Sequence, residues 1–505
     1  MNGDLAAQVR ETHTGVVVLL GDKAYKVKKP LVTDFLDFST TAHRERACQH
    51  ELSLNRRLAP GSYLGVAHLS DPQGGDAEPV IVMRRHSDAA RLSTLVKSGR
   101  PVGDELLAIA NVLARFHASA ERGHTIDGQG TVEAVWGRWQ QNLRELAEFP
   151  EEVLPQDSIR EVTRLAGQFV AGRDELFTRR IEEGHILDGH ADLLADDIFC
   201  LPEGPALLDC LEFDDRLRYV DGIDDAAFLA MDLEFLGRRD LADHFLDRYT
   251  QLAADSAPSS LVDFYVAYRA LVRAKVDCVR VSQGHPEAAD DARRHLGIAV
   301  QRLRAGTVRL VIVGGGPGSG KTTLATALAA QLAAHVVSTD VVRRRLQDHG
   351  VVGGAAGDLN AGLYSPENVA AVYDAVLREA QVWLRAGHSV ILDGTWRDAG
   401  QRDRAHDLAD RTSAALVEFT CSVPIAEASA RIEHRPRSNS DATPEIAAAL
   451  ADADSHRSGA HDIDTSRPLA DSVKEAIEIC CRTTELARRN DRAGGADGDR
   501  DVRPR

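Results

Sequence analysis

A glycine-rich stretch from Gly315 to Thr323 constrains this chain more than any other feature, since it reads Gly-Gly-Pro-Gly-Ser-Gly-Lys-Thr-Thr. This spacing fits the phosphate-binding P-loop pattern G-x-x-x-x-G-K-[ST]. The apolar run 308–313 before it predicts a buried strand, and the Ala- and Leu-rich run 324–332 after it predicts a helix. A strand, a glycine loop and a helix N-terminus in this order form an anion site, because backbone N–H groups and the helix dipole point at the phosphates.

The residue types in this loop predict ATP and Mg²⁺ as its ligands. The glycines let the backbone approach the phosphates closely, because they carry no Cβ atom. Lys321 is expected to reach the β- and γ-phosphates, and the hydroxyl of Thr322 is expected to bind Mg²⁺. The predicted nucleotide-binding residues here are Gly315, Gly318, Gly320, Lys321, Thr322 and Thr323.

Composition limits the classes of partner. The 505 residues include 60 Lys and Arg against 77 Asp and Glu, a formal charge of −17, which argues against a general nucleic-acid or anionic-membrane binder but does not exclude a local basic groove. The N-terminus lacks a basic region followed by an apolar one, and no apolar run approaches the roughly 20 residues that span a bilayer. Seven cysteines, none in a C-x-x-C, indicate reduced thiols. We therefore expect a cytoplasmic protein with no membrane partner.

The first 85 or so residues predict a small lobe of strands and one helix. Strands are expected at 15–20, 23–28 and 79–84, and a charged helix that includes Glu51 at 42–58. In the second strand Ala24, Lys26 and Lys28 share one face, because side chains alternate along a strand. Two lysines on one face indicate either a solvated sheet edge or a functional lysine.

After the first lobe the sequence predicts mostly helices, then alternating strands and helices, and finally a polar tail. Helices are predicted at 106–120, 132–149, 159–182 and several within 224–303. After the P-loop, strands at 336–340, 389–393 and 415–421 alternate with helices such as 367–385, which predicts a parallel sheet covered on both faces. Residues 488–505 are rich in Gly, Asp and Arg and lack apolar anchors, so we expect a disordered tail.

A cluster of carboxylates lies between the predicted helices of the N-terminal half. His190, Asp192 and Asp197 follow the spacing H-x-D-x-x-x-x-N of a kinase catalytic loop, with Asp in the last place. Asp209 lies on the far strand of a short predicted hairpin, where a second metal-binding Asp belongs. Phosphoryl transfer needs a carboxylate to accept the hydroxyl proton, oxygen ligands for Mg²⁺ and a lysine on the phosphates. Asp192, Asp197, Asp209 and Lys26 supply these groups.

The segments His190-Ala191-Asp192-Leu193, Leu208-Asp209-Cys210 and Arg218-Tyr219-Val220-Asp221 resemble the aminoglycoside phosphotransferase and choline kinase family. The resemblance covers about residues 10–290. It implies a two-lobed, protein-kinase-like α+β fold, with Asp192 as catalytic base, Asp209 as Mg²⁺ ligand, Lys26 (or Lys28) on the phosphates and Glu51 as the partner of that lysine. That family's substrates are small hydroxyl compounds.

Two departures from the family pattern are visible. Asp197 replaces the usual Asn; it can ligate Mg²⁺ through oxygen but adds a negative charge beside the triphosphate. No glycine-rich loop of the protein-kinase type occurs near the N-terminus. A catalytically degenerate fold used for binding or regulation is therefore an alternative. The acidic run Asp214, Asp215, Asp221, Asp224 and Asp225 fits either an acidic substrate pocket or a solvated surface.

The C-terminal half carries further candidates after its second and third strands and near its end. Asp340 and Arg343 form D-x-x-R at a helix start, Asp393 ends an apolar strand, and Arg431 and Arg435 lie four apart on a helix that breaks at Pro436. This set resembles small-molecule and polynucleotide P-loop kinases, such as gluconate kinase, chloramphenicol phosphotransferase and the zeta-toxin group, over about residues 306–485.

That resemblance implies a role for each residue. Asp340 would deprotonate the acceptor hydroxyl, Arg343 would position it, and Asp393 would act on Mg²⁺ through water. Arg431 and Arg435 would close over the transferring phosphoryl group and stabilise its charge. The alternatives are a plain helix N-cap for Asp340 and a solvated helix face for the two arginines.

These observations together predict a kinase-like domain at residues 1–300, an α/β P-loop kinase domain with a parallel sheet at 305–487, and a tail at 488–505. The arrangement resembles bacterial fusions of an aminoglycoside phosphotransferase-like domain with an AAA-type domain. We expect an ATP- and Mg²⁺-dependent phosphotransferase with two nucleotide sites and a small-molecule hydroxyl acceptor. An ATP-gated regulatory protein is the first alternative. A polynucleotide 5′-kinase is the second, against which the net charge counts. The sequence names neither the acceptor nor the oligomeric state.

Overall fold

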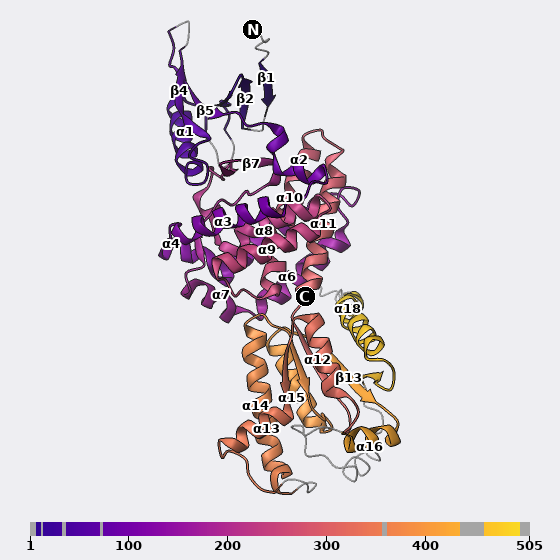
Figure 1. Cartoon of the computed structure of the whole chain (residues 1–505). Helices are drawn as coiled ribbons and strands as arrows, with labels where there is room; N and C mark the ends of the chain where they lie inside the picture. Colours follow the sequence, from indigo (N-terminus) through magenta and orange to yellow (C-terminus); the bar gives the residue numbers. More distant parts are fainter. Residues whose placement is uncertain are drawn as a thin grey trace, which may run out of the picture. The chain divides into compact units, whose positions relative to one another are not determined.

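The computed structural model describes residues 7–11, 14–32, 37–70, 74–355, 361–434 and 459–494, with side chains up to residue 482. Its contacts divide the chain into two compact units (Figure 1). We call the first, formed by Met1–Ile159, Phe177–Ala257 and Tyr265–Arg302, the kinase-like unit. The second, the P-loop unit, is formed by Arg160–Leu176, Pro258–Phe264 and Leu303–Arg505. Relative to the predicted domains, the P-loop unit also takes in two earlier segments.

The kinase-like unit begins with a small lobe built on an antiparallel sheet. The five strands lie in the order β1-β2-β3-β5-β4 and comprise Gln8–Glu11, Gly15–Leu20, Lys23–Lys28, Tyr63–Leu69 (β4) and Glu78–Arg84 (β5). Helix α1, Thr41–Asn55, packs on this sheet through an apolar cluster that includes Cys48, Leu52 and Ile81. The predicted strands 15–20, 23–28 and 79–84 are confirmed, whereas β1 and β4 were not predicted.

The second lobe of this unit is mostly helical. Its helices are α2 (Leu92–Lys97), α3 (Gly103–Ser119), α4 (His124–Asp127), α5 (Val132–Ala147), α7 (Asp174–Glu182), α8 (Gly222–Phe235), α9 (Arg239–Ala253), α10 (Ser259–Ser282) and α11 (Ala288–Ala305), of which α7, α10 and α11 extend into the segments of the P-loop unit. Two short antiparallel pairs, β6 (Ile186–Asp188) with β9 (Tyr219–Asp221) and β7 (Ile198–Leu201) with β8 (Gly204–Leu207), carry the loops that contain the predicted carboxylates.

The P-loop unit is built on a parallel sheet in the order β11-β12-β10-β13-β14. Its strands are β10 (Arg309–Gly314), β11 (His335–Ser338), β12 (Val390–Asp393), β13 (Ala415–Ser422) and β14 (His461–Asp464), the last of which was not predicted. The helices are α6 (Gln156–Ala171, whose first residues belong to the other unit), α12 (Lys321–Leu332), α13 (Thr339–Asp348), α14 (Pro366–Arg385), α15 (Ala399–Arg411), α16 (Ile425–Glu433) and α18 (Leu469–Gly494).

The order of elements places the candidate residues at one edge of this parallel sheet. The P-loop follows β10, Asp340 follows β11, and Asp393 ends β12, and these three strands are hydrogen-bonded neighbours. Ligands of open α/β sheets bind at the carboxyl ends of the strands. The predicted fold class, a two-lobed kinase-like α+β part followed by an α/β P-loop part with a parallel sheet, is confirmed. Helix α18 continues through residues 488–494, where a disordered tail was predicted, and residues 495–505 lie outside the described part.

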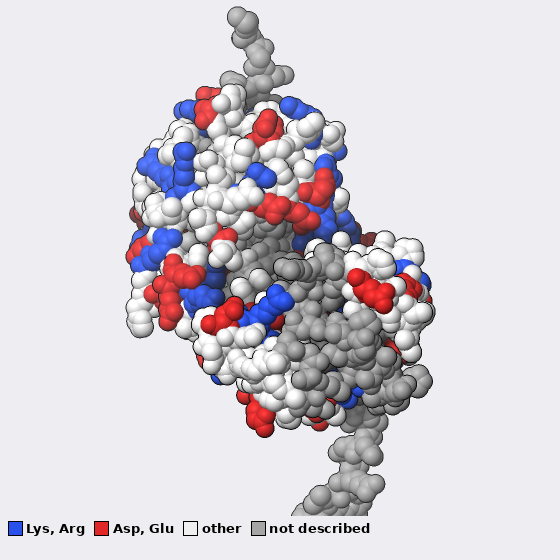
Figure 2. Space-filling view, turned by 60° about the horizontal axis from the view of Figure 1, so that its bottom comes forward, with Lys and Arg blue, Asp and Glu red and all other residues white. Residues whose placement is uncertain are grey.

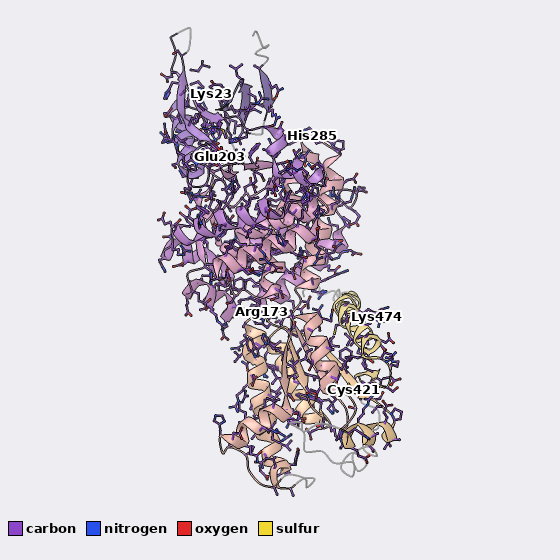
Figure 3. All side chains as sticks on the ribbon, viewed as in Figure 1. Lys23, Arg173, Glu203, His285, Cys421 and Lys474 are labelled. Carbon is purple, nitrogen blue, oxygen red and sulfur yellow. The ribbon has the colours of Figure 1, made fainter. Side chains whose placement is uncertain are left out.

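Two helices of the P-loop unit are capped by segments that precede it in the sequence. The hydroxyl of Ser260 donates a hydrogen bond of 2.6 Å to the carbonyl of Gly387, directly after α14. The guanidinium of Arg173, labelled in Figure 3, donates one of 2.6 Å to the carbonyl of Thr412, directly after α15. The last carbonyls of a helix lack partners within it, and a cation is favoured at that end of its dipole. Residues 160–176 and 258–264 thus complete this unit.

Surface charge and helix composition relate to two possible partners, nucleic acid and membrane. On the face shown in Figure 2, basic and acidic side chains are interspersed, and its described residues form no extended surface of a single sign. Among the helices that the structure describes, none is long and apolar enough to cross a lipid bilayer.

Candidate active sites

The loop that carries Asp192 is fixed from behind by a buried carboxylate. Asp225, in the first turn of α8, accepts hydrogen bonds of 2.7 Å from the backbone N–H groups of His190 and Ala191 and one of 2.9 Å from Nε2 of His117. These bonds hold Ala191 at a φ of 65°, a conformation that L-residues rarely adopt. Burial alone would raise the pKa of Asp225, but His117 and the loop N–H groups hold this pKa below its usual range. No local pattern in the sequence indicates this role.

The acidic run around Asp225 is neither a solvated surface nor an open acidic pocket. Asp221, Asp224 and Asp225 are all buried. Arg180 pairs with Asp221 at 2.6 Å, and Arg269 pairs with Asp224 at 2.7 Å. For these three residues, both the solvated surface and the acidic substrate pocket are therefore wrong, because their carboxylates are buried and paired with side chains or backbone N–H groups of the protein.

The two lysines of β3 are buried rather than at a solvated edge; they share Glu51 as a partner and differ in their second carboxylate. Nζ of Lys26 lies 2.8 Å from Oε1 of Glu51 in α1 and 2.9 Å from Oδ1 of Asp209. Nζ of Lys28 lies 2.5 Å from the other oxygen of Glu51 and 2.8 Å from Oε1 of Glu212. Lys26 is thus the lysine that meets the predicted metal ligand, and the interpretation of both as a solvated edge is wrong.

The three candidate carboxylates of this site have shifted pKa values. Burial raises the pKa of Asp192 to about 7, although the charge of Arg273 opposes the shift. Burial, Asp209 and Asp192 raise the pKa of Asp197 well above its usual value. The charge of Lys26 lowers the pKa of Asp209. Such groups of unlike pKa in one place are characteristic of proton-transfer and metal sites.

Asp197 and Asp209 fit a Mg²⁺ site by their chemistry. Carboxylate oxygens are the ligands that Mg²⁺ prefers, and a cation would relieve the repulsion that raises the pKa of Asp197. No group of three or more His, Cys, Asp or Glu side chains able to hold a metal occurs among the described residues. The remaining ligands would therefore come from phosphate oxygens and water, as is usual for Mg²⁺ on nucleotides.

A cavity of about 680 Å³ opens beside these groups. Its lining includes Lys26, Asp197 and Asp209, and further charged residues line it as well: Arg10, Arg84, Arg85, Asp88 and Arg91. Its apolar walls come from both lobes and include Val17, Leu19, Ala24, Met83, Phe199 and Leu208. Apolar walls together with charged groups are the usual lining of a small-ligand site, and this cavity suits a nucleotide, with apolar side chains for the base and Lys26 for the phosphates.

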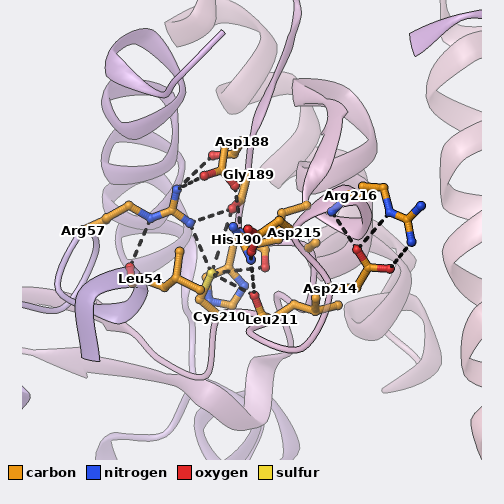
Figure 4. Close-up of polar contacts among 12 residues, drawn as sticks. Leu54, Arg57, Asp188, Gly189, His190, Cys210, Leu211, Asp214, Asp215 and Arg216 are labelled. Atoms are coloured by element: carbon orange, nitrogen blue, oxygen red, sulfur yellow. Dashed lines mark hydrogen bonds and ion pairs between the residues drawn. The ribbon is translucent and has the colours of Figure 1, made fainter. Parts of the chain in front are cut away.

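Arg57 lies in the turn after α1, the helix that contains Glu51. Its side chain contacts the loops that contain the candidate carboxylates (Figure 4). Its guanidinium donates hydrogen bonds of 2.9 Å to Oδ2 of Asp188 and to the carbonyl of Gly189, just before His190. It also donates to Sγ of Cys210, next to Asp209, at 3.3 Å. Arg57 was not predicted from the sequence, because a charged residue near a helix end belongs to no motif.

Three glycines of the P-loop adopt backbone conformations that other residues rarely take. Gly315, Gly318 and Gly320 have φ values of 137°, 74° and 81°, which favour glycine. Nζ of Lys321 donates a hydrogen bond of 2.8 Å to the carbonyl of Gly316. In the same loop, Oγ of Ser319 is buried and has no hydrogen-bond partner among the described residues. A phosphate oxygen would satisfy this hydroxyl, which the sequence analysis did not single out.

The metal side of the P-loop joins two predicted residues. Oγ1 of Thr322 donates a hydrogen bond of 2.9 Å to Oδ2 of Asp393 at the end of β12. Burial raises the pKa of Asp393, while Lys321 and the hydroxyl of Thr322 oppose the rise. A hydroxyl and a carboxylate side by side next to a phosphate loop fit Mg²⁺, with Thr322 as direct ligand. Thr323 follows in the first turn of α12 and lines an adjacent cavity.

The predicted D-x-x-R pair is formed. Oδ1 of Asp340 accepts a hydrogen bond of 2.6 Å from Nη1 of Arg343, and the guanidinium lies 4.5 Å from the ring centre of Tyr364. The N-cap of α13 is Ser338, so the interpretation of Asp340 as a plain N-cap is wrong. Asp340 keeps one carboxylate oxygen that is not used by this pair, at the same sheet edge as the P-loop.

Arg431 lies beside the P-loop, at a cavity of about 380 Å³ lined also by Gly318, Gly320 and Thr323. It donates hydrogen bonds of 2.6 Å to Oε1 of Glu427 and 2.8 Å to the carbonyl of Thr465. The hydroxyl of Thr465 in turn donates to the carbonyl of Ser319 at 2.7 Å. Sequence analysis missed Thr465, which follows the unpredicted strand β14. Arg435, the second predicted lid arginine, lies outside the described residues.

Comparisons with known proteins give one family match and several similar solved structures. The family described as "AAA domain" matches residues 310–458. Among solved structures, the choline/ethanolamine kinase family protein from Mesorhizobium loti is 16% identical with a TM-score of 0.36, and the match covers 59% of this chain and 92% of that protein. The gluconokinase from Sinorhizobium meliloti 1021 is 16% identical with a TM-score of 0.27, covering 36% of this chain and 95% of that protein.

Two relatives match nearly the whole chain. They are "Uncharacterized protein Rv2004c" of Mycobacterium tuberculosis and "Uncharacterized protein Mb2027c" of Mycobacterium bovis. Each is 59% identical over 471 residues, which cover 93% of this chain and 95% of the relative. The chain therefore belongs to the same protein family as these mycobacterial proteins.

Proposed function

We propose that this protein is an ATP-dependent phosphotransferase that moves the γ-phosphoryl group to a hydroxyl of a small molecule, with one nucleotide site in each unit. The observation that carries the proposal is the meeting of three features at one edge of the parallel sheet. These are the P-loop, the Thr322–Asp393 hydrogen bond of 2.9 Å and the Asp340–Arg343 pair at 2.6 Å. A phosphate cradle, metal ligands and a carboxylate able to take a hydroxyl proton are what phosphoryl transfer needs.

In the P-loop unit each residue has a role that follows from its place. The loop N–H groups and Lys321, released from the carbonyl of Gly316, would bind the triphosphate. Thr322 and Asp393 would hold Mg²⁺, which when bound neutralises charge on the β- and γ-phosphates. Asp340 would accept the proton of the acceptor hydroxyl, and Arg343 would hold this carboxylate in place. Arg431 would stabilise the transferring phosphoryl group, with Arg435 as its proposed second member.

In the kinase-like unit Asp192 would accept the proton of the acceptor hydroxyl. Lys26, held by Glu51, would bind the phosphates, and Asp197 and Asp209 would hold Mg²⁺. Lys26 now pairs with Asp209 at 2.9 Å, and it would exchange this contact for a phosphate oxygen on nucleotide binding.

The proposal predicts a pH profile for the kinase-like site. A base must be ionised, and burial raises the pKa of Asp192 to about 7, so ATP turnover should increase as the pH rises through about 7. Because the charge of Arg273 opposes this shift, Arg273→Met should move the inflection to higher pH. The measurement is kcat/KM against pH for a Lys321→Ala protein, in which only this site is intact. An inflection that does not move in Arg273→Met would contradict the assignment of Asp192 as the base.

The test of the proposed function is ATP consumption by wild type, Lys321→Ala and Asp192→Ala. Each is assayed with sugars, amino alcohols, aminoglycosides and a 5′-hydroxyl oligonucleotide. An acceptor should stimulate turnover, and the substitution in the working site should lower that stimulation by about 10²-fold or more. Lys474→Ala, which removes an exposed lysine of the P-loop unit, is the matched control and should change nothing. If no acceptor stimulates turnover in any protein, the phosphotransferase proposal fails.

One observation favours a second candidate, an ATP-gated binding or regulatory protein. Asp197 stands where Mg²⁺-dependent kinases of this kind carry Asn, and it adds a negative charge beside Asp209 and Asp192, which together with burial raise its pKa. In that case Lys321→Ala removes only slow hydrolysis of ATP, and Asp192→Ala changes nothing. Stimulation by the oligonucleotide alone, with strong salt sensitivity, would instead identify a polynucleotide kinase.

A further inference from the structure

The kinase-like site contains a buried row of alternating charges that extends beyond the phosphate lysine. In order, the row is Asp209, Lys26, Glu51, Lys28 and Glu212, joined at 2.9, 2.8, 2.5 and 2.8 Å. Lys28 forms the second half of this row. We propose that Lys28 is a positioning residue: it holds Glu51 in place from the side opposite Lys26 and ties α1 to the loop that follows Asp209. This inference rests on the proposed nucleotide site of the kinase-like unit.

Lys28 is placed for this role and not for binding phosphate itself. The side chains of Lys28 and Glu51 are 0% exposed, and both ion pairs of Lys28 are with carboxylates, while its ammonium group also lies 5.3 Å from the ring centre of Phe38. Burial lowers the pKa of Lys28, but Glu51 and Glu212 outweigh it and raise this pKa, so the ammonium group stays charged. Lys26 is the lysine that lines the nucleotide-sized cavity, together with Asp209.

The row connects β3, α1 and the loop after Asp209, whose contacts would change when a nucleotide binds. Lys26 and Lys28 lie in β3, Glu51 in α1, and Glu212 three residues after Asp209. When a nucleotide takes Lys26 away from Asp209, Glu51 becomes the only carboxylate of this row still paired with Lys26. Lys28 keeps Glu51 from following Lys26, since it binds the other oxygen of the same carboxylate. It also keeps Glu212, and with it the loop that presents Asp209, against α1.

Two hypotheses, that Lys28 only balances charge and that it positions Glu51, predict different results when Lys28 is replaced. Lys28→Met leaves Glu212 as a partly buried charge without its partner, and this lowers stability under either hypothesis. Adding Glu212→Gln removes that charge, so Lys28→Met/Glu212→Gln should recover much of the stability. If Lys28 only balances charge, the double variant also recovers nucleotide binding. If Lys28 positions Glu51, binding of the phosphates stays impaired, because Glu51 is still held from one side only.

The experiment compares two ligands in a Lys321→Ala background, where the P-loop is disabled. The Mg²⁺ complex of AMP-PNP probes the phosphate lysine, and adenosine probes the apolar cavity alone. We expect Lys28→Met and the double variant to lose about 10-fold or more in affinity for Mg²⁺·AMP-PNP, and to keep adenosine affinity within about twofold. Lys29→Met, a neighbouring lysine that pairs with Glu11, is the matched control and should keep both affinities.

Two results overturn the inference. One is equal loss of both ligands in Lys28→Met with full recovery in the double variant, which identifies a structural lysine. The other is unchanged AMP-PNP affinity in Lys28→Met. Failure of the proposed function looks different: the Lys321→Ala parent itself then binds no Mg²⁺·AMP-PNP, and the inference falls with it before any change at Lys28.

Discussion

Asp225→Ala should lower the free energy of unfolding of the kinase-like unit by about 3–5 kcal/mol, which is the usual loss when one partner of a buried charge network is removed. Three donors lose their acceptor at once: the N–H groups of His190 and Ala191, both at 2.7 Å, and Nε2 of His117 at 2.9 Å. Each buried donor without an acceptor costs about 1–3 kcal/mol. Guanidinium chloride unfolding at pH 7 measures the loss.

Two controls and a pH series sharpen this prediction. Asp240→Ala removes an exposed carboxylate of the same unit, which pairs with Arg238 at the surface, and should cost no more than about 0.5 kcal/mol. The folded-state pKa of Asp225 lies below its unfolded value, so its contribution is complete above the unfolded pKa and is lost as the pH falls through the folded pKa. The difference between wild type and Asp225→Ala should therefore shrink in acid. A difference below about 1 kcal/mol at pH 7 would show that water or a rearrangement replaces the carboxylate.

The same substitution connects stability with chemistry. Asp225 holds the loop in which Ala191 has a φ of 65°, and Asp192 follows directly. A loop released from this strained conformation no longer presents Asp192 at a fixed place. Any turnover assigned to Asp192 should therefore be lost in Asp225→Asn as well, even where that variant folds, because the amide cannot accept both N–H groups with the same carboxylate geometry.

Elements whose signals are local could be predicted from the sequence. Strands β2 and β3 flank a Gly21–Asp22 turn; β2 is a continuous apolar run and β3 alternates between buried and more exposed residues, so the ends of both were predicted correctly. The P-loop combines glycine spacing with a buried strand before it, since every residue of β10 is buried. The edge strands β1 and β14 carry no such signal: all four residues of β1 are exposed, and in β14 only Ile463 is buried.

The candidate sites divide in the same way. Residues within a spaced motif, such as Asp192, Lys321 and Asp340, could be proposed from the sequence, because the motif itself encodes the geometry. Asp225 and Arg57 act through contacts with residues far away in the chain, and nothing next to them in the sequence indicates those contacts. The partners of Lys28 depend on how α1 and the Asp209 loop meet β3, so the sequence alone could not separate its role from that of Lys26.

The break between α6 and α7 shows why one helix was predicted where two exist. The pattern of 159–182 is helical throughout, yet α6 ends at Ala171 and α7 begins at Asp174. Gly172 lies against the end of α15: a Cβ atom there would be 2.1 Å from the carbonyl oxygen of Thr412 and 2.7 Å from its carbon. Arg173 donates to that same carbonyl. The turn is therefore set by a contact about 240 residues away in sequence, which no local pattern contains.

Gly172→Ala should accordingly destabilise the P-loop unit by about 2–4 kcal/mol, because the new methyl group meets backbone that cannot move without disrupting the capped end of α15. Gly137→Ala is the matched control: Gly137 lies inside α5 with nothing within 4 Å of its ideal Cβ, so alanine there should stabilise the kinase-like unit by about 0.5–1 kcal/mol. Denaturant unfolding with and without Mg²⁺·ATP assigns each change to its unit when Lys321→Ala is measured beside it, because the nucleotide-shifted transition of the P-loop unit is the one whose shift that substitution removes. If Gly172→Ala leaves the nucleotide-shifted transition unchanged, residues 160–176 do not belong to the P-loop unit. If only the transition of the P-loop unit moves, that unit requires residues 160–176 for its fold, and a fragment that begins at residue 305 would lack them.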